Sequence, residues 1–258
     1  MKRSTRHFFI RMLAMCIVVG TVCVVTVQAQ DKSQKTIAIL YFENNSVVDK
    51  EKLEPLKKGL VDMLITEMSK VKGIKVVERQ RIQSIVEELN LNETDMVEQE
   101  TSQKMGKLLG AKVMLFGGFS NLFKDKFRID VRIIKTETGE TIKAEEETGE
   151  LNDFLPMLQS LVKKIANELE VKLSSAEENS LEASEGNFSG YITHAKALSM
   201  EDEGRKLEKI GKKVEALDKI ENAKAMYQKA VDESKYEGAV KKVDEMTKLL
   251  VEIRKTTK

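Results

Sequence analysis

The sequence predicts an α/β protein in which helices flank a mixed sheet, followed by a small all-helical region. Three observations favour this class. Short runs of strand-forming residues alternate with helical periodicities over residues 35–173, which is the order of βαβ units. A turn signal then joins two strands, which adds antiparallel pairing to the parallel pairing. After residue 186 apolar residues recur only at helical spacing, and 41% of the 258 residues are hydrophobic, enough for a packed core.

The first strands and helices alternate along the chain. Residues 36–42 form a short apolar run rich in strand formers, and residues 51–71 repeat leucine, methionine and valine at spacings of three and four, with Pro55 in the first turn. Residues 74–78 are typical of a second strand, and two helical patterns follow it. The first of these runs from about Ile82 to Leu89, and the second ends at Gly110.

The last strands of this region form a hairpin. Residues 113–116 are an apolar strand whose end we expect at Gly117-Gly118, and residues 127–133 alternate perfectly, which places Arg128, Asp130 and Arg132 on one face. Thr138-Gly139 is a turn signal before a polar strand over 141–148, whose three glutamates, 145–147, suit an exposed sheet edge. An amphipathic helix over 151–169 completes the α/β domain.

We expect a linker at residues 174–186, which are rich in serine and glutamate, and a helical region at 187–258. Within that region the spacing of Gly211, Ala223, Tyr227 and Ala230 matches one tetratricopeptide repeat, in which small residues let two helices cross closely. Because about three repeats are needed for independent stability, the alternative is a helical hairpin that packs on the first domain or on a partner.

The first 29 residues have the pattern of a secretory signal peptide. Four basic residues lead into an apolar stretch over 12–27, which closes on the small-residue cleavage pattern Val27-Gln28-Ala29. The alternative is an uncleaved anchor, although the stretch is shorter than the roughly 20 residues that span a bilayer. We therefore predict export to the periplasm, with association to the outer membrane left open.

Cleavage would also remove most residues that support catalysis. Both cysteines, Cys16 and Cys23, lie in this segment, and 39 basic residues would remain against 42 acidic ones, which gives no electrostatic case for nucleic acid. His194 would be the only histidine, on what we expect to be an exposed helix face, and no G-x-S-x-G motif accompanies it. The sequence shows no dinucleotide or phosphate loop and no metal-ligand spacing. We therefore expect neither an enzyme nor a cofactor or metal site.

Four ordered motifs, followed by Gly117, resemble the CsgG family, best known for the curli secretion channel subunit. The motifs span residues 37–44, 59–67, 76–79 and 106–111. Their candidate scaffold or partner-surface residues are Phe42, Glu43, Asn44, Gly59, Asp62, Glu67, Glu78, Arg79, Gly106, Gly110 and Gly117. The resemblance implies a periplasmic α/β scaffold over about residues 35–172, with the family's habit of forming oligomers or binding protein partners.

The resemblance also sets the expected function. We expect a non-enzymatic periplasmic envelope protein that supports export or assembly of extracellular or outer-membrane material through protein–protein contacts, with peripheral membrane contact at most. One alternative is an oligomeric secretion channel subunit of the outer membrane, whose lipid-facing strands would have to include residues 116–134 with Phe119, Phe123 and Phe127. Another alternative is a periplasmic regulator of a peptidoglycan synthase.

Overall fold

The computed structural model describes residues 34–258 apart from 92–98, 124–125, 183–185 and 257–258, and residues 34–258 form one compact unit. The expected signal peptide, residues 1–29, lies outside the described residues. The elements along the chain are β1 Lys35–Asn44, α2 Lys50–Leu53, α3 Leu56–Met68, β2 Ile74–Val76, α4 Arg79–Glu88, α5 Gln99–Leu109, β3 Val113–Phe123, β4 Lys126–Lys135, β5 Thr141–Gly149, the 3-10 helix η2 Leu151–Asp153, α6 Phe154–Glu168, α7 Ser175–Ser180, α8 Phe188–Lys209, α9 Lys213–Ser234 and α10 Glu237–Lys255.

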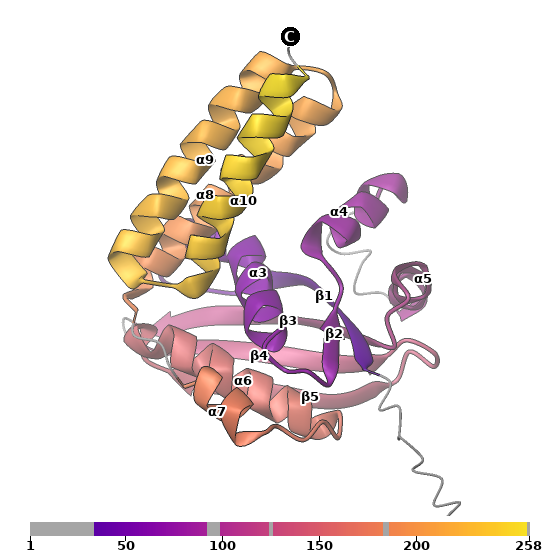
Figure 1. Cartoon of the computed structure of the whole chain (residues 1–258). Coiled ribbons are helices and arrows are strands. Elements are labelled where there is room, and N and C mark those ends of the chain that lie inside the picture. Colours follow the sequence, from indigo (N-terminus) through magenta and orange to yellow (C-terminus); the bar gives the residue numbers. More distant parts are fainter. Residues whose placement is uncertain (1–33, 92–98, 124–125, 183–185, 257–258) are drawn as a thin grey trace, which may run out of the picture. The chain divides into compact units, whose positions relative to one another are not determined.

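The strands form one mixed sheet in the order β2-β1-β3-β4-β5 (Figure 1). β1 pairs in parallel with both β2 and β3, while β3, β4 and β5 form an antiparallel meander. The expected fold class, a mixed sheet flanked by helices with a helical C-terminal part, is confirmed. The expected single helix over 51–71 is divided into α2 and α3 at Pro55, which has no amide hydrogen to continue the helical hydrogen bonds, although Glu54 and Pro55 keep helical dihedral angles.

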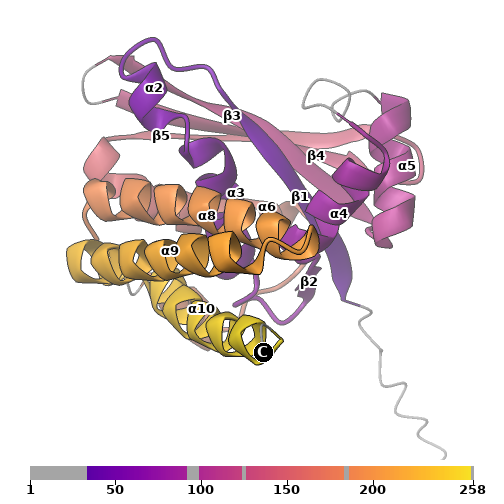
Figure 2. The same ribbon diagram turned by 90° about the horizontal axis from the view of Figure 1, so that it is seen from above.

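One face of the sheet carries the main core, which α3, α6 and α8 cover (Figures 1 and 2). A chain of aromatic rings runs through it, with centroids 5.6 Å apart between Phe119 and Phe127, 5.6 Å between Phe127 and Phe154, and 5.4 Å between Phe154 and Phe188. Phe119 and Phe127 are fully buried in this core, so they do not face lipid as the channel alternative requires, whereas Phe123 is 71% exposed.

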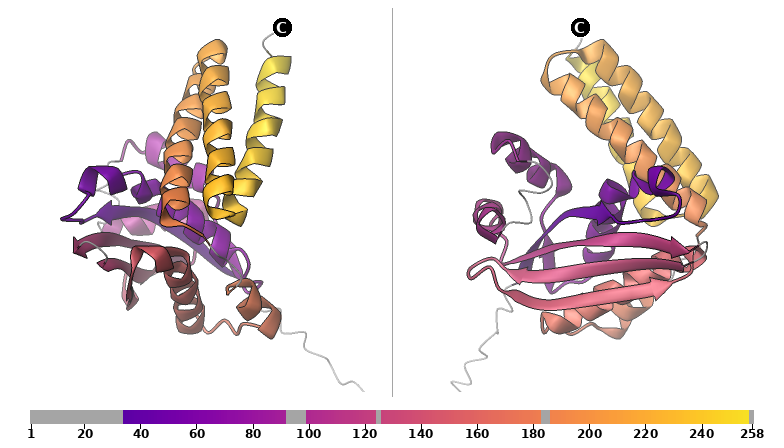
Figure 3. Two further views of the ribbon diagram at one scale, coloured as in Figure 1. Left: turned by 90° about the vertical axis from the view of Figure 1, so that its left-hand side faces the viewer. Right: turned by 180° about the vertical axis from the view of Figure 1, so that it is seen from behind.

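The opposite face of the sheet is covered only in part. Helices α4 and α5 pack there against side chains of β1 and β3, in a second core that includes Leu40, Ile82, Met105, Met114 and Phe116. Seen from behind, strands β3, β4 and β5 have no helix in front of them, and α4 and α5 lie to one side (Figure 3, right). This uncovered part, called the open face below, is formed by the outward side chains of β3 to β5 and the end of β1.

The edge strand β5 is polar and largely exposed, as expected. Its outer edge is partly blocked, because Lys164 of α6 donates to the backbone oxygen of Glu146 at 2.8 Å. Glu147 accepts a hydrogen bond from Ser160 and forms an ion pair with Lys164 at 3.0 Å. These contacts tie the edge to α6 and occupy the backbone oxygen of Glu146, which another strand could otherwise pair with.

The three long helices α8, α9 and α10 lie side by side and continue from the covered face (Figures 1 and 3). The expected linker at 174–186 contains α7, which begins with a capping box between Ser174 and Glu177, and Leu181 is buried in the main core. At the crossing of α3 and α8, a Cβ added to Gly59 would lie 2.4 Å from the Cβ of Ala195. The helical region therefore shares its core with the α/β part.

The packing role expected for Gly211 is wrong. Gly211 lies in the turn between α8 and α9 at a φ of 81°, and no atom lies within 4 Å of the position that its Cβ would take. A left-handed turn favours glycine, so the backbone accounts for this residue. Ala223, Tyr227 and Ala230 are fully buried in α9, where they do pack between helices.

Candidate partner-binding site

Four residues form a row across the open face because each is the register partner of the next. Glu43 of β1 pairs with Gly118 of β3, Gly118 pairs with Asp130 of β4, and Asp130 pairs with Glu146 of β5. Register partners point to the same face of a sheet, so three carboxylates share this row, with a glycine between the first and the second. Arg128 and Arg132 lie two residues before and after Asp130 on β4, so their side chains point to the same face, next to this row.

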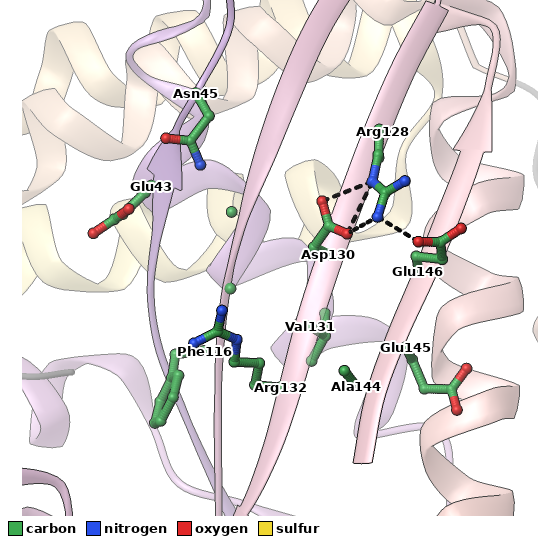
Figure 4. Close-up of a pocket in the computed structure, with 12 residues that line it drawn as sticks. Glu43, Asn45, Phe116, Arg128, Asp130, Val131, Arg132, Ala144, Glu145 and Glu146 are labelled. Carbon is green, nitrogen blue, oxygen red and sulfur yellow. Dashed lines mark hydrogen bonds and ion pairs between the residues drawn. The ribbon is translucent and has the colours of Figure 1, made fainter. Parts of the chain in front are cut away.

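These rows line a groove of about 560 Å³ on the open face, shown in Figure 4. Its lining consists of Glu43, Asn45, Phe116, Gly117, Gly118, Arg128, Asp130, Val131, Arg132, Ala144, Glu145 and Glu146. The carboxylates of Glu43, Asp130 and Glu146 and the guanidinium groups of Arg128 and Arg132 face the groove, whereas Glu145 pairs in register with the buried Val131, so its side chain lies on the other face of the sheet. We call it the sheet groove.

The two glycines shape the floor of the sheet groove in different ways. A Cβ at Gly117 would lie 1.8 Å from the backbone oxygen of Asp130, so only glycine lets β4 approach this closely. At Gly118, which points into the groove, the nearest atom would be the side-chain nitrogen of Asn45 at 2.7 Å. Both glycines lie inside β3, so the expected strand end is wrong, and at Gly117 the physical reason is the close approach of β4.

Arg128 is fixed in the sheet groove by two carboxylates. Its Nε donates to Asp130 at 2.9 and 3.0 Å, its Nη2 donates to Asp130 at 2.6 Å, and Nη2 also donates to Glu146 (Figure 4). The hydrogen bond and charge of Asp130, with those of Glu146, raise the pKa of Arg128. Within the described residues Glu43 and Arg132 form no ion pair, so the internal neutralisation is confined to one side of the groove.

A second group of polar residues is buried where the helical region meets α3 and α4. Asp62 accepts from His194 Nε2 at 3.0 Å, and its other oxygen lies 3.7 Å from both Arg79 Nε and Lys242 Nζ. Arg79 also forms an ion pair with Asp202 at 2.7 Å. We call these residues, together with Glu201 and Tyr227, the buried charge cluster. Its members are Asp62, Arg79, His194, Glu201, Asp202, Tyr227 and Lys242.

The remaining contacts of the buried charge cluster centre on Glu201. It accepts from Tyr227 at 2.7 Å and from Arg205 at 2.8 Å, and Lys242 lies 3.3 Å away. Glu201 and His194 are fully buried. The expected exposed position of His194 is therefore wrong, because α8 packs that face of the helix on α3.

The charges in the buried charge cluster hold one another ionised. Burial alone would raise the pKa of Asp62, but the charge of Lys242, the hydrogen bond and charge of His194 and the charge of Arg79 outweigh it and lower that pKa. Burial would likewise lower the pKa of Lys242, yet Asp62, Glu201 and Glu245 raise it. Every buried charge thus has an opposite partner, which is the arrangement of a structural cluster.

The motif residues divide between these two places and the core. Glu43 and Gly117 line the sheet groove, whereas Asp62 and Arg79 belong to the buried charge cluster. Phe42 is fully buried in the main core, where it packs below Gly117. The sequence motifs therefore do not converge on one site.

The other motif residues hold local structure. Asn44 donates to the backbone oxygen of Lys50 at 2.8 Å and accepts from the amide of Ser46 at 3.1 Å, which fixes the turn after β1. Glu67 is buried and pairs with Lys70 at 2.9 Å. The three remaining positions are the exposed Glu78 at the start of α4, Gly106 facing Thr136, and Gly110, which ends α5 at a φ of 65°.

Sequence reasoning missed the buried charge cluster because its members come from α3, α4, α8, α9 and α10. It found the outward position of Arg128, Asp130 and Arg132 from their alternation, but not their row with Glu43, which requires the register of β1 on β3.

In the part of the chain that the structure describes, no group of histidine, cysteine or acidic residues is arranged to hold a metal ion. None of the helices in that part is sufficiently long and apolar to cross a membrane.

Comparison with known families supports the resemblance seen in the sequence. Residues 20–122 match the family described as curli production assembly/transport component CsgG, so the similarity to CsgG is confirmed over those residues. No curated protein gives a significant match.

Several solved structures resemble the chain at low identity. Lipoprotein GNA1162 from Neisseria meningitidis is 14% identical, with a TM-score of 0.38, over 54% of this chain and 99% of its own. The LpoB C-terminal domain from Escherichia coli is 13% identical, with a TM-score of 0.33, over 44% and 81%. A PelC dodecamer from Paraburkholderia phytofirmans is 10% identical, with a TM-score of 0.33, over 54% and 90%.

Proposed function

We propose, from the match of residues 20–122 to the curli production assembly/transport component CsgG, that this chain is a non-enzymatic protein of the cell envelope. Its role is to support the export or assembly of extracellular or outer-membrane material through protein–protein contacts. The family match is the single observation that carries this proposal. Residues 1–29 would direct export to the periplasm before removal.

The geometry supports binding through the open face. The chain's own helices cover one face of the sheet and part of the other, which leaves the sheet groove without a cover from the described residues. Arg128 is already held by two carboxylates, so the groove presents an ordered charge pattern without a partner present. An ordered polar surface of this kind suits recognition of another protein.

The proposal is tested by photo-crosslinking in the native host with the full chain. A crosslinking amino acid replaces Arg132 in the sheet groove or, as a control, Asp244, which is exposed on α10. We expect Arg132 to give one defined adduct with an envelope protein in the periplasmic or outer-membrane fraction, and Asp244 not to give that adduct. Recovery of the chain only in the cytosol, or no defined adduct from any surface position, would reject the proposed function.

The two narrower roles stay predictions. A secretion channel subunit requires conductance of the purified protein in planar bilayers, and a regulator of a peptidoglycan synthase requires that synthase as the crosslinked partner. The same crosslinking experiment separates them, because it identifies the protein that contacts the groove.

A further inference from the structure

A groove between α4 and α8 shares no lining residue with the sheet groove. It has a volume of about 530 Å³, and we call it the helix groove. Five of its lining residues are cationic and three are carboxylates. The lining consists of Lys58, Arg79, Gln80, Gln83, Ser84, Glu87, Ser199, Asp202, Glu203, Arg205, Lys206 and Lys209.

Helical spacing forms the two walls of the helix groove. On α8 the residues at 199, 202, 206 and 209 recur at spacings of three or four, so they lie on one face of the helix, and those at 80, 83, 84 and 87 share one face of α4. Long side chains bridge the walls, because Arg79 reaches Asp202 at 2.7 Å and Lys209 reaches Glu87 at 3.4 Å. The two polar faces therefore lie opposite each other across the groove.

Each carboxylate of the helix groove already has a cationic partner. The ion pairs are Asp202 with Arg79 at 2.7 Å and with Lys58 at 3.2 Å, Glu87 with Lys209 at 3.4 Å, and Glu203 with Lys219 of α9 at 2.9 Å. The groove therefore presents no unpaired carboxylate to an incoming cation.

Three cationic side chains of the lining keep donors that nothing in the described part of the chain uses. Lys206 is exposed and has no ion-pair partner there. Arg205 is bound to Glu201 at 2.8 Å through its Nε, which leaves both of its Nη groups without a partner among the same residues. Arg79 is 4% exposed, and its buried Nη1 has no hydrogen-bond partner. The unused hydrogen-bonding capacity of charged groups in this groove is thus entirely that of cationic donors.

We propose that the helix groove binds an acidic segment of a protein partner, with one carboxylate held by Lys206 and the Nη groups of Arg205. A guanidinium presents its donors as a fork that matches a carboxylate, and the buried charge of Arg79 behind them adds to the attraction. The proposal adds a second contact surface to the function proposed above and rests on that function for the partner being a protein. Residues 199–209 of α8 span about 15 Å, the length of roughly four or five residues of an extended segment.

Two rival occupants are an anionic membrane surface and a second copy of this chain. The groove is recessed between two helices and its central guanidinium is buried, which favours an inserted side chain over a flat lipid surface. If vesicles with phosphatidylglycerol bind the chain through Lys206 and the acidic peptide described below does not bind, the occupant is a membrane and the proposal is overturned. If sizing shows an oligomer that Lys206→Glu dissociates and Lys196→Glu does not, the occupant is a second copy, with the same consequence.

The direct test uses the purified chain without residues 1–29 and two labelled hexapeptides, one of alternating glutamate and threonine and one of alternating glutamine and threonine. Fluorescence anisotropy measures the dissociation constants, and amide NMR spectra locate the binding site. We expect only the glutamate peptide to bind, with weaker binding at high salt, and to shift amide signals over 199–209 of α8 and 80–87 of α4. Lys206→Gln should weaken binding about three- to fivefold, which is the scale of one exposed ion pair, and Lys206→Glu by more than tenfold.

Two further variants are matched controls. Lys196 is also exposed on α8 and has no ion pair among the described residues, but it does not line the helix groove, so Lys196→Gln should leave the dissociation constant unchanged. Lys206→Arg keeps the charge and should keep the binding. Thermal unfolding of the variants should match that of the parent chain, because both lysines lie on the surface.

No binding of the glutamate peptide, equal binding of both peptides, equal losses for Lys206→Gln and Lys196→Gln, or signal shifts confined to other surfaces would overturn the proposal. These results would leave the proposed envelope function intact, since the crosslinking experiment at Arg132 reports on the sheet groove and is scored independently of peptide charge.

Discussion

Asp62 offers the sharpest test of how the helical region is attached to the α/β part. The variant Asp62→Asn keeps the shape of the side chain and its ability to accept from His194, but it removes the negative charge that lies 3.7 Å from both Arg79 and Lys242. Asp62 is 7% exposed, so solvent does not replace that charge. The change therefore leaves two buried cations with less compensation.

The magnitude follows from what remains after the substitution. Removing one partner of a buried ion pair costs about 3–5 kcal/mol. Arg79 keeps Asp202 at 2.7 Å, and Lys242 keeps Glu201 at 3.3 Å and Glu245 at 3.1 Å, so we expect the low end of that range. A loss of about 3 kcal/mol in the free energy of unfolding corresponds to a melting temperature lower by roughly 6–12 °C for a chain of this size.

The assay is urea and thermal unfolding of the chain without residues 1–29, followed by far-ultraviolet circular dichroism. Asp130→Asn is the matched control, because its carboxylate is half exposed and its loss should change the free energy of unfolding by less than about 0.5 kcal/mol. A change below about 1 kcal/mol for Asp62→Asn, or equal changes in the two variants, would refute the view that the buried charge cluster holds α8 and α10 on α3 and α4.

Three other outcomes are expected. Gly117→Ala should lower the free energy of unfolding by about 2–3 kcal/mol, because its Cβ would meet a backbone oxygen at 1.8 Å. Gly118→Ala should cost less than about 1 kcal/mol in the same urea titration. Equal effects of the two variants would contradict the assigned floor of the groove. Gly59→Val should force α3 from α8 at Ala195, cost about 2 kcal/mol and accelerate amide hydrogen exchange in α8, and unchanged exchange there would refute the close crossing. Acid should destabilise the protein, because the hydroxyl of Ser174 and the amides of Lys72 and Ser174 lower the pKa of Glu177 to about 2. The contribution of the Glu177 carboxylate to the free energy of unfolding is therefore complete above pH 4.5 and is lost as the pH falls toward 2. Glu177→Gln should flatten the fall in stability measured across that range.

The order of strands and helices could be predicted from the sequence because it depends on local periodicity. The alternation over residues 127–133 gave both the strand and its outward face, and the turn signal at Thr138-Gly139 gave the hairpin. The end of β3 was placed too early because Gly117-Gly118 is typical of a strand end when only the local sequence is considered. In the fold Gly117 is required by the closeness of β4, which is a contact between separate strands.

The buried charge cluster could not be predicted for a related reason. Amphipathic patterns identify which apolar residues face a core, and they assign polar residues to solvent by default. Asp62 and His194 are 132 residues apart, and each looks exposed on its own helix. Their burial depends on the packing of α8 against α3, which the small residues Gly59 and Ala195 allow but do not specify.

The same packing decides which surface is left for a partner. The ring of Tyr191 on α8 lies 5.4 Å from that of Phe154 on α6 and 5.7 Å from that of Tyr236 on α10, so the aromatic chain from the sheet continues into the helical region. A region attached through a shared aromatic core and a set of compensated buried charges covers α3 as long as that core is intact. A partner that docks without unfolding this core therefore has to use a surface other than that face of α3. The helices leave the open face of β3 to β5 uncovered, so their attachment determines that the sheet groove, the surface proposed for binding, is available to a partner.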